Sequence, residues 1–263
     1  MIGAIIGDIV GSKFEFNNTF DYSFPLFDKG CNYTDDTICT IAVADAILNA
    51  EDGVPTDRDF RLSLQYWCKK YPYPMGAYGS SFINWVNSSN PQPYDSFGNG
   101  AAMRVSPVGF AFVDDEVVLR TAMNSAKVSH SHIEGLIGAS AVALAISEIR
   151  CSSKPKTILY DTMDDFYGID WEKNIPWKGK FNETCQGCVP LAFKICIESR
   201  DFEDAIRQAI SYGGDSDTLG AIVGGIAEAM YGVPSKMKAK ALGYLTHEML
   251  NVYFKFEKKY GNN

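Results

Sequence analysis

Apolar residues recur along this chain with the spacing of one face of an α-helix, and the alternation typical of strands is almost absent. In residues 38–48, isoleucine, alanine and valine fall on one face, and in residues 58–69 Phe60, Leu64 and Trp67 do the same. The same period continues in six further segments: 117–127, 133–149, 189–197, 202–210, 218–230 and 236–256. The pattern by itself predicts an all-α protein.

Two segments lack this period and are predicted to be loops or short irregular pieces. Residues 71–94 are rich in proline, glycine and aromatic side chains, and residues 151–182 are mostly polar. Long loops inside a compact domain are often functional. The longest apolar stretches, 135–146 and 219–227, are too short to span a bilayer, so we expect no membrane insertion. Their glycine and alanine content predicts helices that approach one another closely.

Composition adds limits on domain number and partners. The 263 residues are 46% hydrophobic and 21% charged, with no Pro/Ser-rich linker, which predicts a single domain over residues 1–263. The formal net charge of −8 argues against an extended nucleic-acid surface, since such a surface is normally basic. This net charge does not exclude a nucleotide-containing ligand in one pocket. We expect a monomer.

The seven cysteines are an odd number with irregular spacing, and the apolar start is interrupted by Asp8 without a basic leader. These features predict reduced thiols and a cytoplasmic protein. Cys185 and Cys188 form one C-x-x-C pair. A structural zinc would need two more soft ligands, and a thioredoxin-type site would need a βαβ context. Buried thiols at the start of a helix are the prediction here.

Acidic and hydroxyl side chains gather in two short clusters, each just ahead of an alanine-rich helical pattern. The first is Thr-Asp-Asp-Thr at residues 34–37, and the second is Gly-Gly-Asp-Ser-Asp-Thr at residues 213–218. One interpretation is that each cluster only caps a helix, since Thr, Ser and Asp are preferred there. The other is that the fold joins them around a cation. Carboxylates and hydroxyls suit hard ions such as Mg²⁺, Mn²⁺ or Ca²⁺.

Further motifs accompany the clusters in a fixed order. They are Gly7-Asp8-Ile9-Val10-Gly11 with Glu15; Gly98-Asn99-Gly100-Ala101-Ala102-Met103-Arg104 with Pro107; Ser129-His130-Ser131-His132-Ile133-Glu134-Gly135; and Cys185-Gln186-Gly187 with Val189-Pro190. In this order and at these spacings, residues 1–232 resemble the ADP-ribosylglycohydrolase family, which includes the dinitrogenase reductase-activating glycohydrolases. The chain is most similar to the short, single-domain bacterial-type members.

The resemblance implies an orthogonal helical bundle with a central binuclear metal cleft. It implies two Mg²⁺ ions per site, with Mn²⁺ as an alternative. The metal ligands that it implies are Thr34, Asp35, Asp36, Asp215, Asp217 and Thr218. Asp36 and Asp217 are also expected to take part in catalysis. Ser216 occupies a position that varies in the family, and the rest of the block is intact.

Glu15 matches the early glutamate of the family, which lies over the scissile bond, apart from the metal ligands, and acts as acid or base. The alternative is a surface carboxylate, but the aromatic neighbours Phe14 and Phe16 could raise its pKa into a useful range. Asp8 is expected to cap a helix or to support the metal ligands from behind.

The residues implied to bind substrate lie in the middle and late motifs. Gly98, Asn99 and Gly100 fit a turn whose N–H groups could cradle a diphosphate, although a plain turn explains them equally from composition alone. Arg104 could pair with phosphate or form an internal salt bridge. His130 matches a family histidine near the phosphates, whereas His132 could cap the following helix.

Three further positions complete the implied substrate site. Met103 and Gly214 belong to the family blocks. Tyr212 could stack on adenine or fill the core.

The resemblance implies a hydrolase that removes ADP-ribose from a modified acceptor by cleaving the bond at the distal ribose anomeric carbon. An ADP-ribosylated substrate and ADP-ribose as product are the expected partners. The acceptor could be an arginine or serine side chain, a base or a small molecule. Alternatives are a non-catalytic ADP-ribose-binding or crystallin-like structural protein, and a toxin-immunity hydrolase. The intact acidic clusters and Glu15 favour the enzyme.

Overall fold

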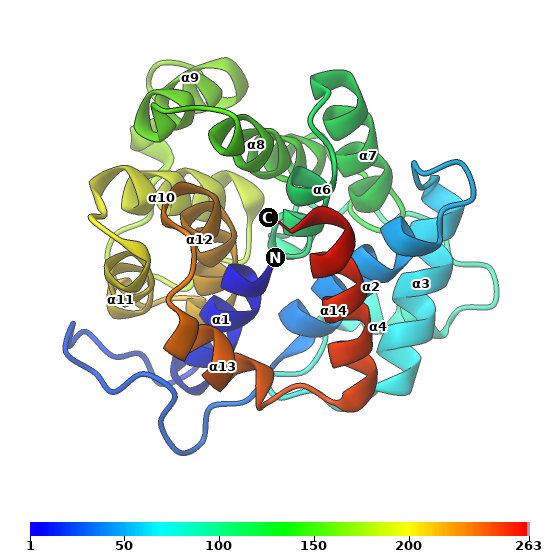
Figure 1. The fold of residues 1–263 in the computed structure, drawn as a ribbon, viewed down its shortest axis with the longest axis horizontal. Helices are drawn as coiled ribbons and strands as arrows, with labels where there is room; N and C mark the ends of the chain where they lie inside the picture. Colours follow the sequence, from blue (N-terminus) through cyan, green and yellow to red (C-terminus); the bar gives the residue numbers. More distant parts are fainter. Residues whose placement is uncertain (262–263) are drawn as a thin grey trace.

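The computed structural model of this protein describes residues 1–261, which form helices and loops without a β-strand (Figure 1). Isolated bridges join Thr34 to Met75 and Gly98 to Thr184. In chain order the helices are α1 (Ile2–Gly11), η1 (Ser12–Phe14), α2 (Asp35–Asn49), α3 (Asp57–Lys70), α4 (Ser80–Asn87), α5 (Gly100–Met103), α6 (Ser106–Ala111), α7 (Asp115–Lys127), α8 (Ile133–Arg150), α9 (Pro155–Tyr167), η2 (Trp171–Asn174), α10 (Cys185–Glu198), α11 (Phe202–Tyr212), α12 (Ser216–Tyr231), α13 (Ser235–Leu242) and α14 (His247–Tyr260). The all-α prediction is confirmed.

Helices α1 and α12 pack side by side near the middle of the molecule (Figure 1). Every residue of α1 is buried, and apart from Asp8 its side chains are apolar around the whole circumference, so it lacks the one-sided pattern of a surface helix. Its glycines at positions 3, 7 and 11 follow one face. A Cβ added at Gly7 would lie 1.8 Å from the carbonyl oxygen of Gly220 in α12. This contact brings the start of α12 beside the end of α1.

The other helices surround this pair. α12 also packs against α8, α10 and α11, while α2 packs against α3 and α14. In Figure 1, α8 to α12 occupy one side of the molecule and α2, α3, α4 and α14 the other. The buried apolar residues form one core cluster that extends from Met1 to Phe256. The division into a single domain stays a prediction, which this continuous core supports.

The sequence pattern and the observed helices agree in most segments and differ in three. The predicted helix at 236–256 is two helices, because Gly243 follows α13 and Thr246 caps α14 through its side chain. The predicted loop at 71–94 contains α4, and the predicted loop at 151–182 contains α9 and η2. α9 begins with a proline at its first position, a place where proline is favourable. Within residues 1–261, no helix combines the length and apolarity needed to cross a membrane.

Candidate functional site

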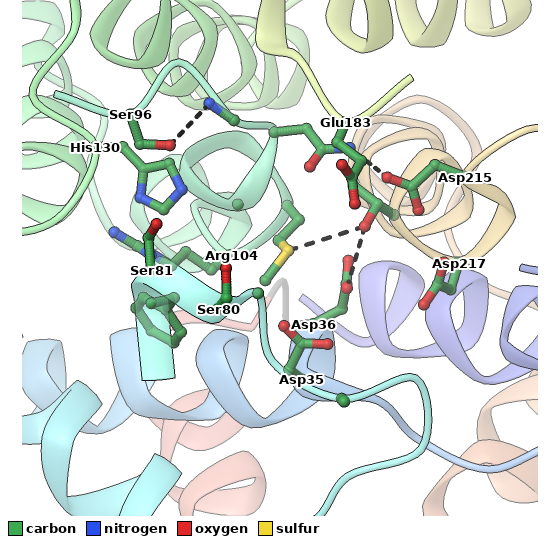
Figure 2. Close-up of a pocket in the computed structure, with 18 of the residues that line it drawn as sticks. Asp35, Asp36, Ser80, Ser81, Ser96, Arg104, His130, Glu183, Asp215 and Asp217 are labelled. Atoms are coloured by element: carbon green, nitrogen blue, oxygen red, sulfur yellow. Dashed lines mark hydrogen bonds between the residues drawn. The ribbon is translucent and has the colours of Figure 1, made fainter. Parts of the chain in front are cut away.

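A cavity of about 470 Å³ opens between the two sides of the helical assembly (Figure 2). Its walls come from the starts of α2 and α12, from the segment around α4 and α5, and from single residues of other loops. The lining residues are Glu15, Asp35, Asp36, Ala77, Gly79, Ser80, Ser81, Phe82, Tyr94, Ser96, Gly98, Asn99, Gly100, Met103, Arg104, His130, Glu183, Asp215, Asp217 and Thr218.

The first acidic cluster forms the start of α2. The Thr34 side chain caps this helix by accepting a hydrogen bond from the Asp36 N–H at 3.2 Å. Behind it, the buried Asp8 carboxylate of α1 accepts from Thr34 N at 3.0 Å, Thr34 Oγ1 at 2.8 Å and Thr37 N at 3.0 Å, and also from Thr37 Oγ1. Asp8 therefore fastens α1 to the start of α2. The carboxylates of Asp35 and Asp36 are left to face the cavity.

The second acidic cluster forms the start of α12. Gly213 and Gly214 adopt positive φ values of 78° and 87°, which let the chain turn sharply into the helix. Asn18 holds this turn, because its side chain donates to Gly214 O at 2.9 Å and accepts from Gly214 N at 2.8 Å. Asp215 occupies the cap position, but its side chain makes no capping hydrogen bond. Capping alone therefore does not account for this cluster.

The two clusters meet across the cavity, as the sequence predicted. Thr218 Oγ1 of α12 donates to Asp36 Oδ2 of α2 at 3.2 Å. Asn99 Nδ2 donates to Asp215 Oδ2 at 2.7 Å and ties the segment before α5 to the same wall. Figure 2 shows Asp35 and Asp36 opposite Asp215 and Asp217.

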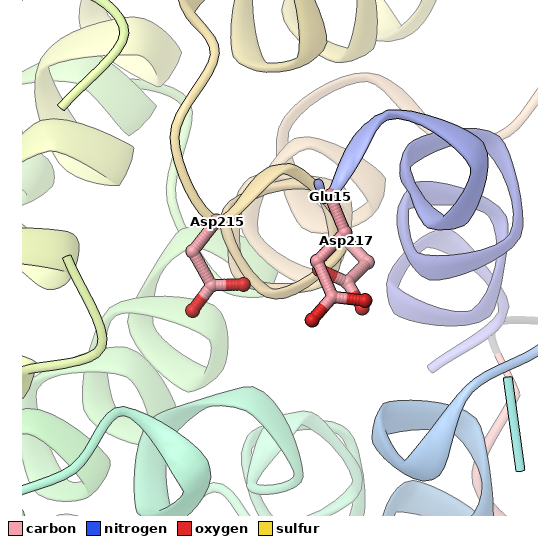
Figure 3. Close-up of side chains that lie close together, drawn as sticks. All are labelled: Glu15, Asp215 and Asp217. Atoms are coloured by element: carbon pink, nitrogen blue, oxygen red, sulfur yellow. The ribbon is translucent and has the colours of Figure 1, made fainter. Parts of the chain in front are cut away.

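Glu15 belongs to the same acidic group (Figure 3). Carboxylate oxygens of Glu15, Asp215 and Asp217 lie within 4.8 Å of one another. From the sequence, Glu15 is expected to stand apart from the metal ligands. Its carboxylate is close enough to share an ion with Asp215 and Asp217, so its separation from the ligands stays a prediction. η1, which continues directly from α1, brings Glu15 to this position. Glu15 Oε2 would lie 2.6 Å from a Cβ at Gly76, so the loop before α4 covers it.

Burial and mutual repulsion raise the pKa values of these acids. The pKa values of Asp36 and Asp217 stand well above the usual range, chiefly because burial disfavours the charged form and then because neighbouring carboxylates repel it. The pKa of Glu15 is raised to about 7 by burial first and by the charge of Asp215 second. Burial also raises the pKa of Asp35 and of Asp215. The positive ends of the α2 and α12 dipoles offset part of this repulsion.

The acidic wall fits a hard divalent cation. Three buried carboxylate oxygens have no hydrogen-bond partner among the described residues: Glu15 Oε2, Asp36 Oδ1 and Asp217 Oδ1. Buried acceptors without partners are costly, and a cation would satisfy them. The donor set consists of carboxylates and the Thr218 hydroxyl, which suits Mg²⁺ or Mn²⁺ better than a soft metal. Thr34 Oγ1 donates to Asp8 and does not line the cavity, so its ligand role stays a prediction.

The opposite end of the cavity is aromatic and cationic. The ring of His130 lies 5.8 Å from that of Tyr94 and 6.4 Å from that of Phe82, measured between centroids. The Arg104 guanidinium lies 5.8 Å from the Phe82 ring centroid. Arg104 forms no salt bridge in the described part of the chain, which excludes the internal ion pair considered from sequence. Figure 2 shows His130 and Arg104 on the side away from Asp215 and Asp217.

The Gly98-Asn99-Gly100 segment connects the two ends. Gly98 and Gly100 approach the His130 ring so closely that a Cβ at Gly100 would lie 2.8 Å from His130 Nε2. Asn99 is held by its backbone N–H, which donates to Glu183 O at 2.7 Å. Met103 lines the cavity, and its Sδ lies 3.9 Å from Thr218 Oγ1. The predicted turn is thus a fixed part of the cavity wall, and its diphosphate role stays a prediction.

Two residues expected to bind substrate lie outside the cavity. The Tyr212 hydroxyl donates to Pro176 O at 2.6 Å, and its ring borders a separate, smaller pocket of about 230 Å³ beside α10 and α11. Gly214 shapes the turn before α12 and does not line the cavity. Tyr212 therefore packs beside α10 and α11, and Gly214 shapes the turn through its backbone, so a substrate-binding role for either residue stays a prediction.

The remaining predictions on histidine and cysteine agree with the structure. His132 caps α8, because its side chain accepts from Glu134 N at 3.2 Å. Cys185 and Cys188 are buried thiols in the first turn of α10. Cys185 Sγ donates to Gly98 O at 3.2 Å and so supports the cavity wall.

Several lining residues were not found from the sequence: Ala77, Gly79, Ser80, Ser81, Phe82, Tyr94, Ser96 and Glu183. Most of them fall in residues 71–94, the proline- and aromatic-rich segment whose length was the available signal of function. Ala77 has a φ of 74°, a strained backbone conformation for a residue with a side chain. Such strain concentrates at functional sites.

Comparison with known proteins gives consistent results. A sequence profile of the ADP-ribosylglycohydrolase family matches residues 1–252. The human ADP-ribosylhydrolase ARH3 is 26% identical over an alignment that covers 95% of this chain and 90% of that protein. The ADP-ribosyl-[dinitrogen reductase] glycohydrolase of Rhodospirillum rubrum is 22% identical and covers 88% of this chain and 84% of that protein.

A solved structure has the same fold. A chain described as an ADP-ribosylglycohydrolase-related protein complex superposes with a TM-score of 0.74 and 22% sequence identity, covering 98% of this chain and 96% of that chain.

Proposed function

Because this chain belongs to the ADP-ribosylglycohydrolase family, we propose that it hydrolyses the bond between an acceptor and the distal ribose of ADP-ribose with the help of divalent cations. The protein is an ADP-ribosylglycohydrolase, and the removal of ADP-ribose follows from the family and its named relatives. The acceptor, the metal dependence and the roles of single residues are the proposed part.

The observation that carries the metal dependence is the set of buried, unpartnered carboxylate oxygens on Glu15, Asp36 and Asp217. We assign cation binding to Asp35, Asp36, Asp215, Asp217 and Thr218, with Glu15 close enough to join them. Divalent cations held there would supply the positive charge that grips the two vicinal hydroxyls of a ribose. The anomeric carbon then lies beside the acidic wall.

The carboxylates contribute in two further ways. Negative charge near the anomeric carbon stabilises the oxocarbenium-like transition state of glycosidic hydrolysis. Glu15, with its pKa raised to about 7, is present in both protonation states near neutrality and can give a proton to the leaving acceptor or take one from water. Burial of the cavity wall strengthens both electrostatic effects.

The aromatic and cationic end suits the rest of the ligand. Phe82 and Tyr94 offer rings for an adenine, and Arg104 with His130 offers positive charge and hydrogen-bond donors near a diphosphate. ADP-ribose placed with its distal ribose at the acids and its adenine at the rings spans both ends of the cavity.

The proposal extends to the acceptor and to the cellular context. We propose an arginine or serine side chain of a modified protein as acceptor. The relative from Rhodospirillum rubrum is named for dinitrogen reductase, which is a protein substrate of that enzyme. We also propose that the protein is a monomer, that it is located in the cytoplasm, and that it binds two Mg²⁺ ions, or Mn²⁺ instead.

One assay distinguishes the acceptors. Purified protein is incubated with arginine-linked, serine-linked and base-linked ADP-ribosyl substrates in Mg²⁺, in Mn²⁺ and in EDTA, and free ADP-ribose is measured. We expect release from one or both side-chain linkages in Mg²⁺ and none in EDTA. Release from the base-linked substrate alone would overturn the acceptor assignment. Binding of ADP-ribose without release from any substrate would overturn the catalytic proposal.

A further inference from the structure

Arg104 is a fully buried arginine whose charge is met by neutral groups in the described part of the chain. It is 0% exposed. One of its terminal nitrogens donates to Ser125 O at 2.7 Å and to Ser129 Oγ at 2.9 Å, while its Nε has no partner among the described residues. A buried cation without a carboxylate favours an anion in the adjoining cavity.

Ser129 transmits the orientation of Arg104 to His130. The Ser129 hydroxyl is buried, accepts the hydrogen bond from Arg104 and lies 2.8 Å from His130 Nδ1. Its own proton needs an acceptor, because a buried hydroxyl that donates to nothing is costly. Among the hydrogen bonds of this hydroxyl in the described chain, Nδ1 is the one available acceptor. Nδ1 must therefore carry a lone pair.

This arrangement fixes where the single ring proton of a neutral His130 resides. With Nδ1 as acceptor, the proton is on Nε2. Nε2 forms no hydrogen bond within residues 1–261 and borders the cavity, 2.8 Å from the place that a Cβ at Gly100 would take. Burial and the Arg104 charge both lower the pKa of His130, which keeps the ring neutral. The ring thus presents an N–H donor to the cavity.

We propose that Arg104 and Ser129 are positioning residues that hold His130 as the Nε2-protonated tautomer, so that His130 donates a hydrogen bond to an anionic oxygen of the ligand. The inference rests on the proposed function for the identity of that ligand, in which the anionic oxygen belongs to the diphosphate of ADP-ribose. The orientation of the Arg104–Ser129–His130 chain rests on the protein alone.

The tautomer can be observed directly in the Mg²⁺-loaded protein. The chain has three histidines, at positions 130, 132 and 247, so long-range proton–nitrogen correlation spectra are simple, and the variants H132Q and H247Q assign them. At about pH 7.5 we expect the His130 ring to show an unprotonated Nδ1 and a protonated Nε2. A protonated Nδ1, or a doubly protonated ring, would overturn the inference.

Two substitutions of His130 test the direction of donation. The side-chain amide of glutamine places an N–H near the position of Nε2, whereas that of asparagine places it near Nδ1. For ADP-ribose binding measured by calorimetry, we expect H130Q to stay within about threefold of wild type and H130N to lose about tenfold or more, the loss of a hydrogen bond to a charged group. Equal affinities of the two variants would contradict the inference.

Arg104 is tested against a matched arginine outside the cavity. Arg150 donates to Gly109 O and Phe110 O and lies over the Phe110 ring, so R150M removes a part-buried arginine without touching the cavity. In R104M we expect the His130 nitrogen signals to move toward averaged tautomers and ADP-ribose affinity to fall about tenfold, with neither change in R150M. If R104M does not fold, R104K supplies the test, because the lysine ammonium keeps the charge but ends one bond short of the terminal nitrogen that makes both hydrogen bonds.

The positioning role of Arg104 and the identity of the ligand are contradicted by different results. An unchanged His130 spectrum in both Arg104 variants would overturn the positioning role, whatever the enzyme hydrolyses. The expected spectra in a protein that binds no ADP-ribose would instead leave the tautomer correct and overturn the proposed ligand.

Discussion

Two kinds of buried carboxylate lie a few ångströms apart in this protein, and their different hydrogen-bond partners indicate different roles. Asp8 accepts four hydrogen bonds from Thr34 and Thr37, so its charge is used within the fold. Asp36 and Asp217 each keep a buried oxygen without a partner and face the cavity. Unsatisfied acceptors of this kind indicate a site that a ligand completes.

Glu15→Gln keeps the shape of the side chain and removes its ability to exchange a proton. We predict that turnover falls by about 10²- to 10⁴-fold, the range for a lost acid–base group, while affinity for ADP-ribose stays near wild type. Single-turnover kinetics and calorimetry measure the two quantities. Glu183→Gln is the matched control, since Glu183 also lines the cavity but has no assigned role in the reaction. Full turnover in Glu15→Gln would place the proton transfer elsewhere.

Asp217→Asn removes one of the charges that would bind a cation. We predict losses in both ADP-ribose binding and turnover, together with a smaller rise in Tm when Mg²⁺ is added, because bound metal stabilises the folded state by mass action. Thermal unfolding with and without Mg²⁺ gives the shift. Asp170→Asn, an exposed change, serves as control. A wild-type Mg²⁺ shift in Asp217→Asn would remove Asp217 from the cation site.

The metal-free protein should lose stability as pH rises. The folded-state pKa values of Asp8 and Glu15 are raised to about 6 and about 7, above 3.8 and 4.5. The folded state therefore binds more protons than the unfolded state in this window, so stability present at low pH is lost as pH rises through these values. In EDTA, we predict a lower Tm at about pH 8 than at about pH 5.5, and a smaller difference in Glu15→Gln. Parallel pH profiles of the two proteins would refute this.

At the scale of the elements, the contact between α1 and α12 decides whether the acids can meet. The glycine spacing of positions 3, 7 and 11 lets the backbones touch, and the end of α1 leads through η1 to Glu15. The start of α12 carries Asp215 and Asp217. The close packing of α1 against α12 thus places the carboxylate oxygens of Glu15, Asp215 and Asp217 within 4.8 Å of one another.

Gly7→Ala tests this contact. The new Cβ would lie 1.8 Å from Gly220 O and 2.2 Å from Gly220 C, so the helices must separate. We predict a destabilisation of about 1–3 kcal/mol, the cost of overpacking a core, with loss of Mg²⁺-dependent stabilisation. Chemical denaturation measures the change in unfolding free energy. Gly79→Ala is the stability control, because nothing lies within 4 Å of its added Cβ. Equal stability of the two variants would contradict the proposed role of the contact.

Helix type and location were largely predictable, while boundaries and buried elements were not. The helical spacing of apolar residues identified α2, α3, α7 and α8, and in α3 and α7 a polar face toward solvent strengthens that pattern. α1 was not predicted from the sequence, since a helix that is buried on all sides has no polar face. The short helices α5 and α6 are four and six residues long, too short to display a period.

At the scale of the whole molecule, one cavity has an acidic end and a cationic, aromatic end. The chain carries a net charge of −8, yet Arg104 and His130 gather opposite the acids. A ligand with vicinal hydroxyls at one end and a diphosphate and base at the other matches this polarity. ADP-ribose has that order of groups, which agrees with the family of the protein.

The sequence predicted the acidic wall better than the aromatic one. Residues 34–37 and 213–218 can be recognised by their acidic and hydroxyl composition. The fold joins the two clusters through the hydrogen bond from Thr218 to Asp36. Phe82 and Tyr94 come from a segment without period or motif, so only the tertiary structure could bring them to the cavity. The same reason explains why Tyr212, adjacent in sequence to the Gly-Gly turn, points elsewhere, toward Pro176.

The central claim is that the acidic wall holds the divalent cations on which ADP-ribose removal depends. The most direct test is the rate of ADP-ribose release from a side-chain-linked substrate by protein stripped with EDTA, followed by titration with Mg²⁺. We predict that release is absent in the stripped protein, returns with added Mg²⁺, and does not return in Asp217→Asn. Full release by stripped wild-type protein would contradict the account.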